Sequence, residues 1–513
     1  MREGPVTTIV ISDVHVTTAE PPDPARPMWK RYKQADLFVD GRIARMLRDV
    51  RRSAPGRVEL VLNGDFFDFD GVTQLPRDGR FPTTWLERHR GLAPTAAKSA
   101  WKMDRILDDH PELVAALREH VVDGHDLVVV PGNHDIDLLW PEVQERLLRR
   151  LDLDRGHTDP SVGERGAVRF CDWFYVSGGD TLIEHGNQYD SYCLCYDPIW
   201  PTIRLDDGPP RMRLPFGNHA SRVMINGMGI INPHADATWI MPFWGFVLFF
   251  WQHVLRVQPL LPFTWMWTAT VTFWLSVRDG LEPSERDVLR LEERVEEIAE
   301  RARGTPRMVR GLLALRVHPA FFTPWRIARE LWLDRLLLFA LVVVGTFQVL
   351  ATANVFVVVS IWWWLALLGL FFPPFLFYAR SVNSEALDFD RAVGRRLHLV
   401  SAVAGVSRVV FGHTHREGHE VHGGVEVLNP GTWSPAFADP TCRVRVGRTC
   451  VVRIEPTEGG ARVASARVWL DPGWETLPEV VDGQPSGSAP LVPPFRRPEI
   501  DGQVGQGANV AKM

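Results

Sequence analysis

The sequence has few cysteines and little net charge. Among its 513 residues only five are cysteine, and none has zinc-finger spacing, so we expect scattered reduced thiols and no structural zinc. The formal net charge of −5 at pH 7 argues against nucleic acid as the main partner. Residues 1–8 lack the apolar core of a secretory signal. A chain of this length has room for two or three domains.

Charged residues are missing from two long blocks, 237–277 (apart from Arg256) and 336–379. About 20 apolar residues cross the hydrocarbon core of a bilayer. We therefore predict membrane helices over 237–255, 257–277, 336–352 and 355–379, with Thr352–Asn354 separating the last two. A re-entrant or interfacial hairpin is the alternative for the first pair. A buried pair of core helices is the general alternative, but bulky apolar side chains surround the second block on all sides.

Arginines flank the uncharged blocks and set an orientation. Arg204, Arg211, Arg213 and Arg222 precede the first block, several more lie between the blocks, and others follow from Arg380 onward. Positive residues stay on the cytoplasmic side, so two hairpins would return the chain there each time. We predict a multi-pass protein of the plasma (inner) membrane with its soluble part in the cytoplasm and the lipid bilayer as a partner.

One stretch before these blocks carries a dense set of polar groups. The apolar run Val128–Val130 ends in Pro131-Gly132, and Asn133, His134 and Asp135 follow at once. The run predicts a buried strand and Pro-Gly a tight turn. Open α/β sheets bind ligands at the carboxyl ends of their strands. A turn that merely contains Asn and Asp is the alternative for this stretch taken alone.

Four more short apolar runs end in the same way. Asp13 and His15 follow 8–11, and Asp65 and Asp68 follow 58–62. His185 follows 181–183, and His413 and His415 follow 409–411. If the backbone stays extended, residues two apart point to one side and form a metal corner. The alternatives are that Asp13 caps a turn, that His15 is an exposed bystander, and that Asp68 caps a helix.

The strands alternate with amphipathic helices, predicted over 35–50 and 96–122, and this alternation predicts an α/β fold. Residues 1–200 would form the first part of the domain and 380–474 its second part. The inserted membrane region would cover 201–379, with a charged helical loop at 278–335. Residues 475–513 are rich in Pro, Gly and Ser, so we expect a disordered tail there.

The polar groups at these strand ends are suited to divalent metals. Oxygen and nitrogen ligands together suit Mn, Fe, Zn or similar ions. Seven of the polar residues named above are candidate ligands. This is more than one ion needs, so two ions that share a carboxylate fit better. Asp65 stands at the mouth of its strand, where one carboxylate could contact both ions. Such two-metal sites activate water and clamp a phosphoryl group.

The ordered set of motifs resembles the calcineurin-like metallophosphoesterase superfamily over residues 9–190 and 409–433. The resemblance implies a two-sheet α/β sandwich flanked by helices and interrupted here by the insertion. It implies one ion held by Asp13, His15, Asp65 and His415. It implies a second ion held by Asp65, Asn133, His185 and His413. In this scheme His134 faces the substrate phosphate and Asp68 orients His134.

The details of one motif narrow the resemblance. Protein Ser/Thr phosphatases of the superfamily carry Arg-Gly where this chain has Phe69-Asp70, which argues against phosphoprotein substrates. The stretch 64–69 looks more like the bacterial UDP-2,3-diacylglucosamine pyrophosphatase branch, although that branch is not known for crossing helices. The sequence therefore predicts a membrane-anchored phosphoesterase acting on a lipid-linked or nucleotide-linked phosphoester or pyrophosphate.

A membrane transporter or sensor with a non-catalytic metal domain is the alternative function. Transporters usually carry ionisable groups at mid-membrane depth, and His253 is the only such group in the predicted crossings. A degenerate, non-catalytic scaffold is disfavoured because no position of the ligand set is missing. The physiological substrate, the metal and the oligomeric state are left open by the sequence.

Overall fold

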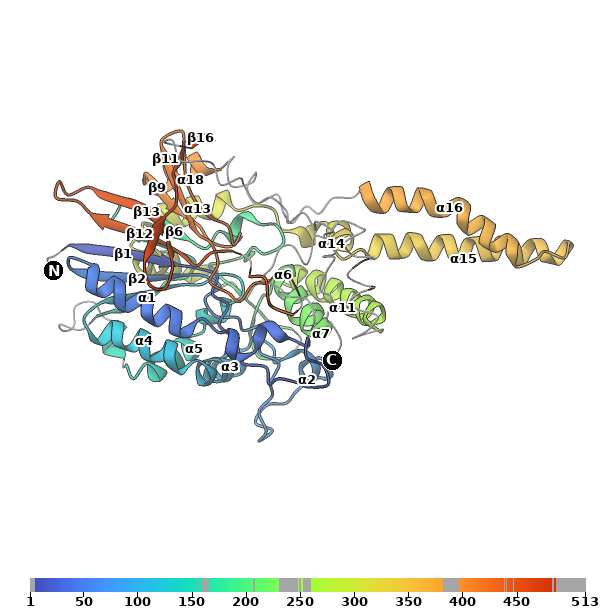
Figure 1. The fold of residues 1–513 in the computed structure, drawn as a ribbon, viewed down its shortest axis with the longest axis horizontal. Helices are drawn as coiled ribbons and strands as arrows, with labels where there is room; N and C mark the ends of the chain where they lie inside the picture. Colours follow the sequence, from blue (N-terminus) through green and yellow to red (C-terminus); the bar gives the residue numbers. More distant parts are fainter. Residues whose placement is uncertain are drawn as a thin grey trace, which may run out of the picture.

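The computed structural model describes most of the chain and centres on two packed β-sheets (Figure 1). The described residues are 5–153, 155–158, 166–205, 208–229, 248, 251, 260–381, 396–437, 439, 441–445, 447–481 and 484–485. Each of the two large sheets has seven strands, and a two-stranded sheet pairs β7 (Thr202–Ile203) with β8 (Arg211–Met212). The predicted α/β class is confirmed as two mixed sheets flanked by helices.

The first sheet has the strand order β14-β13-β12-β1-β2-β3-β4. Its parallel half consists of β1 (Val6–Ile11), β2 (Arg57–Asn63), β3 (Asp126–Val130) and β4 (Val168–Phe170). Its antiparallel half consists of β12 (Cys450–Pro456), β13 (Arg462–Trp469) and β14 (Trp474–Thr476). Because β12 pairs directly with β1, the two ends of the chain build one sheet.

The second sheet has the order β16-β15-β10-β11-β9-β6-β5. Its strands are β5 (Phe174–Ser177), β6 (Thr181–Glu184), β9 (Arg408–Val410), β10 (Glu417–His422), β11 (Val425–Pro430), β15 (Val480–Val481) and β16 (Gln484–Pro485). β5 and β6 form an antiparallel hairpin, with Tyr175 opposite Ile183. β6 pairs in parallel with β9 across the whole insertion. Strands β14 to β16 lie within 474–485, so the predicted disorder from 475 is wrong up to that point.

Alternation along the strands divides the core into layers. Ile9 and Ile11 face the outer helices, whereas Val10 between them faces the other sheet. Val10 packs there with Ile183 and Val410 of the second sheet. Successive side chains of a strand point to opposite faces, so β1 is buried on both sides. The site therefore stands on strands that cannot shift without disturbing two core layers.

Helices cover both outer faces (Figure 1). The first sheet is covered by α1 (Asp40–Ser53), α3 (Ala96–Asp109), α4 (Pro111–Val122) and α5 (Pro141–Arg150). The second is covered by α12 (Leu291–Arg301), α13 (Pro306–Leu315) and α18 (Leu397–Ala404). The single helix predicted over 96–122 is wrong, because Pro111 has no N–H to donate and starts a new helix. The helix predicted from residue 35 begins only at Asp40.

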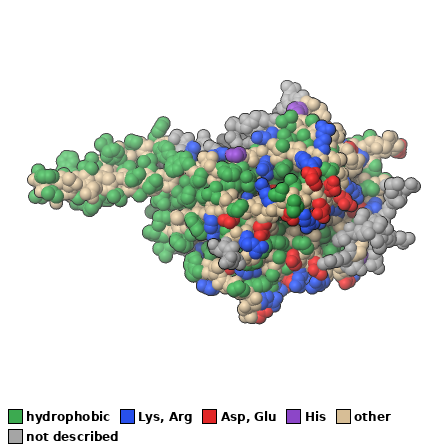
Figure 2. All heavy atoms as spheres, turned by 180° about the vertical axis from the view of Figure 1, so that it is seen from behind, with side chains coloured by type: hydrophobic (Ala, Val, Ile, Leu, Met, Phe, Trp, Pro, Cys, Tyr) green, Lys and Arg blue, Asp and Glu red, His purple; other side chains and the backbone are tan. Residues whose placement is uncertain are grey.

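Two apolar helices project from the body as a hairpin (Figures 1 and 2). They are α15 (Leu333–Phe356) and α16 (Trp362–Ser381). The break predicted at Thr352–Asn354 is wrong, since α15 continues through these residues and the turn follows at 357–361. Among the described residues α15 alone is long and apolar enough to cross a membrane, by length and composition only. This is weak evidence, so the predicted multi-pass topology is not supported.

The first uncharged block behaves differently where it is described. Nearly all of 237–255 lies outside the described residues. The second predicted helix of this block runs as α11 (Leu261–Leu281), and it packs on α6 (Phe216–His219), the π-helix η6 (Ala220–Ile225) and α7 (Asn226–Met228). Its buried side includes Thr268, Thr272, Ser276 and Asp279. One polar side of α11 is thus docked on the protein, so α11 is not surrounded by lipid.

Shorter elements complete the described chain. They are the helices α2 (Trp85–Arg90) and α14 (Pro324–Glu330) and the 3-10 turns Arg31–Lys33, Ala35–Leu37, Ile136–Leu139, Arg155–Thr158, Asn187–Tyr189, Val288–Arg290 and Ala320–Phe322. The charged loop is helical over α12, where Val295 and Ile298 are buried. Val288 lies outside α12 and is exposed.

Candidate metal centre

Loops from both sheets meet at the carboxyl ends of β1, β2, β3, β6 and β9. The backbone there is unusual, because Asp13, His15, Asp65, His413 and His415 all have φ between 49° and 69°. Residues with a side chain rarely adopt this left-handed conformation, and such residues cluster at functional sites. The expectation that Asp13 and His15 share a side through extended backbone is therefore wrong. Left-handed turns bring these side chains into the site instead.

The first cluster joins Asp13 and His15 to His415, which lies 400 residues after His15 in the sequence. Nε2 of His415 lies 3.3 Å from Oδ1 of Asp13 and 3.3 Å from Nε2 of His15. One potential ligand atom from each residue falls within 4.8 Å of the others. The backbone N–H of His413 donates to Oδ2 of Asp13 at 3.0 Å, which fixes that carboxylate.

The second cluster joins Asp65, His185 and His413. Nε2 of His185 lies 3.1 Å from Oδ2 of Asp65. A further group of potential ligand atoms contains His15, Asp65 and His134, so Asp65 reaches both clusters. Burial of His185 lowers its pKa, but the charges of Asp65 and Asp13 outweigh burial and raise the pKa to about 9. The carboxylates thus create a strong local preference for positive charge.

Asn133 lies between Gly132 and His134, which both approach the Asp65 carboxylate, and it offers an amide oxygen. Its Oδ1 is buried and accepts no hydrogen bond from any described residue. Burying an amide oxygen without a partner costs roughly 1–3 kcal/mol, and a divalent cation would satisfy it. Carboxylate, imidazole and amide donors without cysteine suit Mn, Fe or Zn. The residues present therefore fit the two ions that the sequence predicts.

His134 stands beside the clusters and is held by two carboxylates. Its Nδ1 lies 3.5 Å from Oδ1 of Asp68 and 3.4 Å from Oδ2 of Asp70. Burial opposes protonation, but Asp65, Asp68 and Asp70 together raise the pKa of His134 well above its ordinary value. Asp68 also accepts the backbone N–H of Gly71 at 2.8 Å. Asp68 therefore caps a turn, not a helix, while it contacts His134 as predicted.

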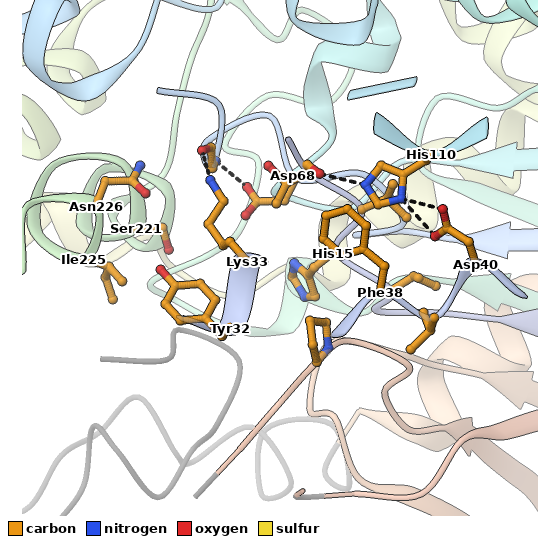
Figure 3. Close-up of a pocket in the computed structure, with 16 residues that line it drawn as sticks. His15, Tyr32, Lys33, Phe38, Asp40, Asp68, His110, Ser221, Ile225 and Asn226 are labelled. Atoms are coloured by element: carbon orange, nitrogen blue, oxygen red, sulfur yellow. Dashed lines mark hydrogen bonds and ion pairs between the residues drawn. The ribbon is translucent and has the colours of Figure 1, made fainter. Parts of the chain in front are cut away.

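A small cavity of about 30 Å³ adjoins His15 and Asp68 (Figure 3). Tyr32 and Ser221 face each other on one side of it, and Lys33 runs along its wall (Figure 3). Nζ of Lys33 donates to the carbonyl of Gly71 at 2.5 Å, and burial lowers the pKa of Lys33 to about 8. The cavity is large enough for a small polar group next to the metal clusters.

Comparison with known proteins agrees with this geometry. Residues 6–211 match the family described as calcineurin-like phosphoesterase. Residues 6–211 form a calcineurin-like metallophosphoesterase domain. No curated protein matches the chain. A crystal structure of wild-type Vps29 complexed with Zn²⁺ from Entamoeba histolytica is similar at 20% identity, with a TM-score of 0.13. That match covers 16% of this chain and 44% of the other, less than half of its length.

Glycines of the metallophosphoesterase domain leave room for the candidate ligands. A Cβ on Gly64 would lie 2.4 Å from the ring of His185, and one on Gly132 would lie 2.4 Å from Oδ1 of Asp65. A Cβ on Gly412, outside the matched residues, would lie 2.7 Å from Oδ2 of Asp13. Real Cβ atoms essentially never come this close. At these three positions a larger residue would therefore force a neighbouring side chain to move.

The structure adds residues that sequence reasoning missed. Asp135 accepts backbone N–H groups from Gly132 at 2.6 Å and from Phe66 at 2.9 Å, so it ties two ligand loops together. Its position directly after His134 was a signal that the sequence offered. Oδ2 of Asp190 lies 3.0 Å from Nε2 of His413. Nothing in the sequence distinguished Asp190, because its position depends on the turn that follows β6.

Proposed function

We propose that the protein is a metal-dependent phosphoesterase that hydrolyses a phosphoester or pyrophosphate bond. The observation that carries this proposal is the pair of clusters that meet at Asp65, with His134 alongside. The match of residues 6–211 to the phosphoesterase family supports the same chemistry. A purely structural metal site would need neither the shared carboxylate nor a buried imidazole beside it.

The residues of the first cluster would hold one ion together with Asp65. Asn133, His185 and His413 would hold the other, again with Asp65. Two such ions supply Lewis acidity to the phosphoryl oxygens and lower the pKa of a water at the site. Asp13 is kept ready for this role by the backbone N–H of His413. The buried Oδ1 atoms of Asn133 and Asp13, which accept no hydrogen bond from a described residue, would each gain a partner from a cation.

His134 performs the acid–base part of the proposed reaction. Burial opposes protonation of its imidazole, but the charges of Asp65, Asp68 and Asp70 favour the protonated form by raising its pKa, and its side chain is 13% exposed. A protonated imidazole next to the phosphate stabilises negative charge and can deliver a proton to the leaving oxygen. The backbone N–H of His134 donates to Oδ1 of Asp65 at 2.7 Å, which fixes the residue relative to the clusters.

We further propose that the α15–α16 hairpin holds the enzyme at a membrane. Large apolar side chains along it are exposed, among them Leu341, Val344, Phe347 and Trp363. Figure 2 shows that hydrophobic side chains cover the hairpin and continue onto the adjoining end of the body. Soluble monomers rarely expose apolar patches above a few hundred Å². A lipid bilayer, with the catalytic domain on its cytoplasmic side, would cover this surface.

Placement at a membrane favours a lipid-linked substrate, with a nucleotide-linked diphosphate as the other form. The likeness of 64–69 to the UDP-2,3-diacylglucosamine pyrophosphatase motif supports this class. The absence of Arg-Gly after Asp68 weighs against phosphoproteins. Detergent-dispersed protein should therefore prefer a phosphate or diphosphate carried by an amphiphile over the same group carried by a peptide.

Asp65→Asn tests the proposed chemistry. Full-length protein loaded with Mn²⁺ should hydrolyse an aryl phosphate monoester or diester. The variant should lose at least about 100-fold of this activity, because one shared ligand is removed from both ions. The exposed Asp78 pairs with Arg80 and provides the control Asp78→Asn, which should leave the activity unchanged. Activity of Asp65→Asn at the wild-type level would contradict the proposal.

A further inference from the structure

Asn218 connects the inserted region to the metal centre. It lies on α6, beyond the residues that match the phosphoesterase family, and it is 1% exposed. Its Nδ2 donates to the carbonyl of Asn133 and to Oδ2 of Asp70, both at 2.6 Å. Its Oδ1 accepts from Nδ2 of Asn133 at 3.3 Å. One side chain thus contacts a candidate ligand and a neighbour of His134.

These contacts decide which way the Asn133 amide faces. Its Nδ2 donates to Oδ1 of Asn218, so its Oδ1 is the end left without a hydrogen-bond partner among the described residues and is the atom proposed as a metal ligand. If the amide turned over, two oxygens would face each other at Asn218 and two N–H groups would face a cation. Both changes are unfavourable, since an N–H cannot ligate a metal and facing oxygens repel. The orientation of Asn133 therefore depends on Asn218.

The position of Asn218 is itself fixed from within the insertion. The next residue, His219, has its Nε2 3.2 Å from Oδ2 of Asp279 on α11. Arg211 and Arg278 also pair with this carboxylate, and Asp279 is fully buried. The contact between His219 and Asp279 and the packing of the two helices hold α6 against α11. The inserted region thus presents Asn218 to the metal loop from a rigid support.

We propose that Asn218 is a positioning residue of the metal centre, supplied by the inserted region. It holds Asn133 with its oxygen toward the second ion and holds Asp70 toward His134. The predicted effect of Asn218 on catalysis rests on the proposed phosphoesterase function. The predicted effect on metal affinity does not depend on that function. Catalysis in this chain then depends on a residue of the inserted region as well as on the candidate ligands.

Asn218→Ala tests the proposal, and Asn226→Ala is its matched control. Asn226 follows on the same helical segment, is also buried, and donates to the backbone carbonyls of Asp70 and Arg222 but not to Asn133. Mn²⁺ binding is titrated calorimetrically on metal-stripped full-length protein in detergent. The loss of such a supporting hydrogen bond typically costs about 10–100-fold in metal affinity or activity.

We expect Asn218→Ala to weaken one of the two Mn²⁺ binding steps about 10–100-fold and to leave the other unchanged. Its kcat should fall by a similar factor while KM changes less than about 2-fold. Asn226→Ala should bind both ions like wild type. Asn218→Ser, which is smaller but polar, serves if Asn218→Ala does not fold, and it should show the same selective loss.

Three results would overturn the proposal: both binding steps unchanged in Asn218→Ala, both steps weakened equally, or the same selective loss in Asn226→Ala. Wild-type protein that binds two ions without hydrolysing any phosphoester would refute the proposed function alone. In that case the binding titrations of the variants still decide the role of Asn218.

Discussion

Gly132 offers a direct test of the geometry at the shared carboxylate. Its φ lies outside the left-handed range, so alanine is compatible with the backbone. The added Cβ would lie 2.4 Å from Oδ1 of Asp65 and 2.7 Å from Cδ2 of His185. Gly132→Ala therefore changes the space next to the clusters and leaves every candidate ligand in the sequence.

The size of the effect follows from these distances. Ordinary contact begins at 3.4 Å, so the carboxylate of Asp65 has to move by about 1 Å. A displacement of this size in a reacting site can cost about 100-fold in rate, which corresponds to about 2.7 kcal/mol in activation free energy. The hydrogen bond from the His134 N–H to the same oxygen, at 2.7 Å, opposes the movement.

Hydrolysis of an aryl phosphate by Mn²⁺-loaded Gly132→Ala measures the loss, and thermal unfolding checks that the fold persists. Gly418→Ala is the control, because Gly418 lies in β10 three residues after His415 and a Cβ there meets no atom within 4 Å. We expect about 100-fold lower kcat/KM for Gly132→Ala and no change for Gly418→Ala. Wild-type activity with two bound ions in Gly132→Ala would refute the arrangement of Asp65 and His185 described above.

Three further predictions follow from other parts of the structure. His134→Asn should lower kcat about 10²–10⁴-fold while both ions still bind, and loss of the ions in a calorimetric titration would show that the residue is a ligand instead. Val344→Arg on the hairpin should shift the protein out of the membrane fraction, since Arg at the centre of a membrane helix costs about 2.5–3.5 kcal/mol. The control Val463→Arg, at a similarly exposed position on β13, should not change the partitioning. Equal partitioning of both variants would argue against anchoring by the hairpin. Burial of Glu87 raises its pKa, but Lys98 and the N–H groups of Thr84 and Ala93 outweigh burial and lower the pKa to about 2. The ionised Glu87 therefore stabilises the fold fully above the unfolded pKa of about 4.3, and this stabilisation is lost as pH falls toward 2. Glu87→Gln should accordingly lower the unfolding temperature at pH 7 more than at pH 3, and an equal decrease at both would contradict this.

The candidate site could be predicted from sequence because each ligand directly follows an apolar strand. Residues such as Val128–Val130 specify a buried strand through local pattern alone, and parallel strands end at a common edge. The polar residues after β1, β2 and β3 therefore meet at one edge of the first sheet and those after β6 and β9 at one edge of the second, and the packing of the two sheets brings both groups together. Asp135 could have been included on the same reasoning, since it belongs to the same run of residues as His134.

Element boundaries were less predictable where local signals competed. The apolar periodicity over 96–122 continues past residue 110, but Pro111 ends the hydrogen-bond ladder and divides the segment into α3 and α4. Conversely, Thr352–Asn354 resembled a turn, yet α15 continues to Phe356 because nothing there interrupts the backbone hydrogen bonds. A single residue therefore sets the end of a helix only when it removes or adds a backbone hydrogen-bond donor.

By itself the sequence determined which chemical groups stand at the strand ends, because apolar alternation and turn residues act over a few positions. Only the tertiary structure decided how those groups are held. The left-handed backbone at Asp13, His15 and His415, the seating of α11 by Asp279, and the contact of Asn218 with Asn133 all depend on segments far apart in the chain. Packing between distant elements compensates for strain and buried charge that no local pattern could reveal.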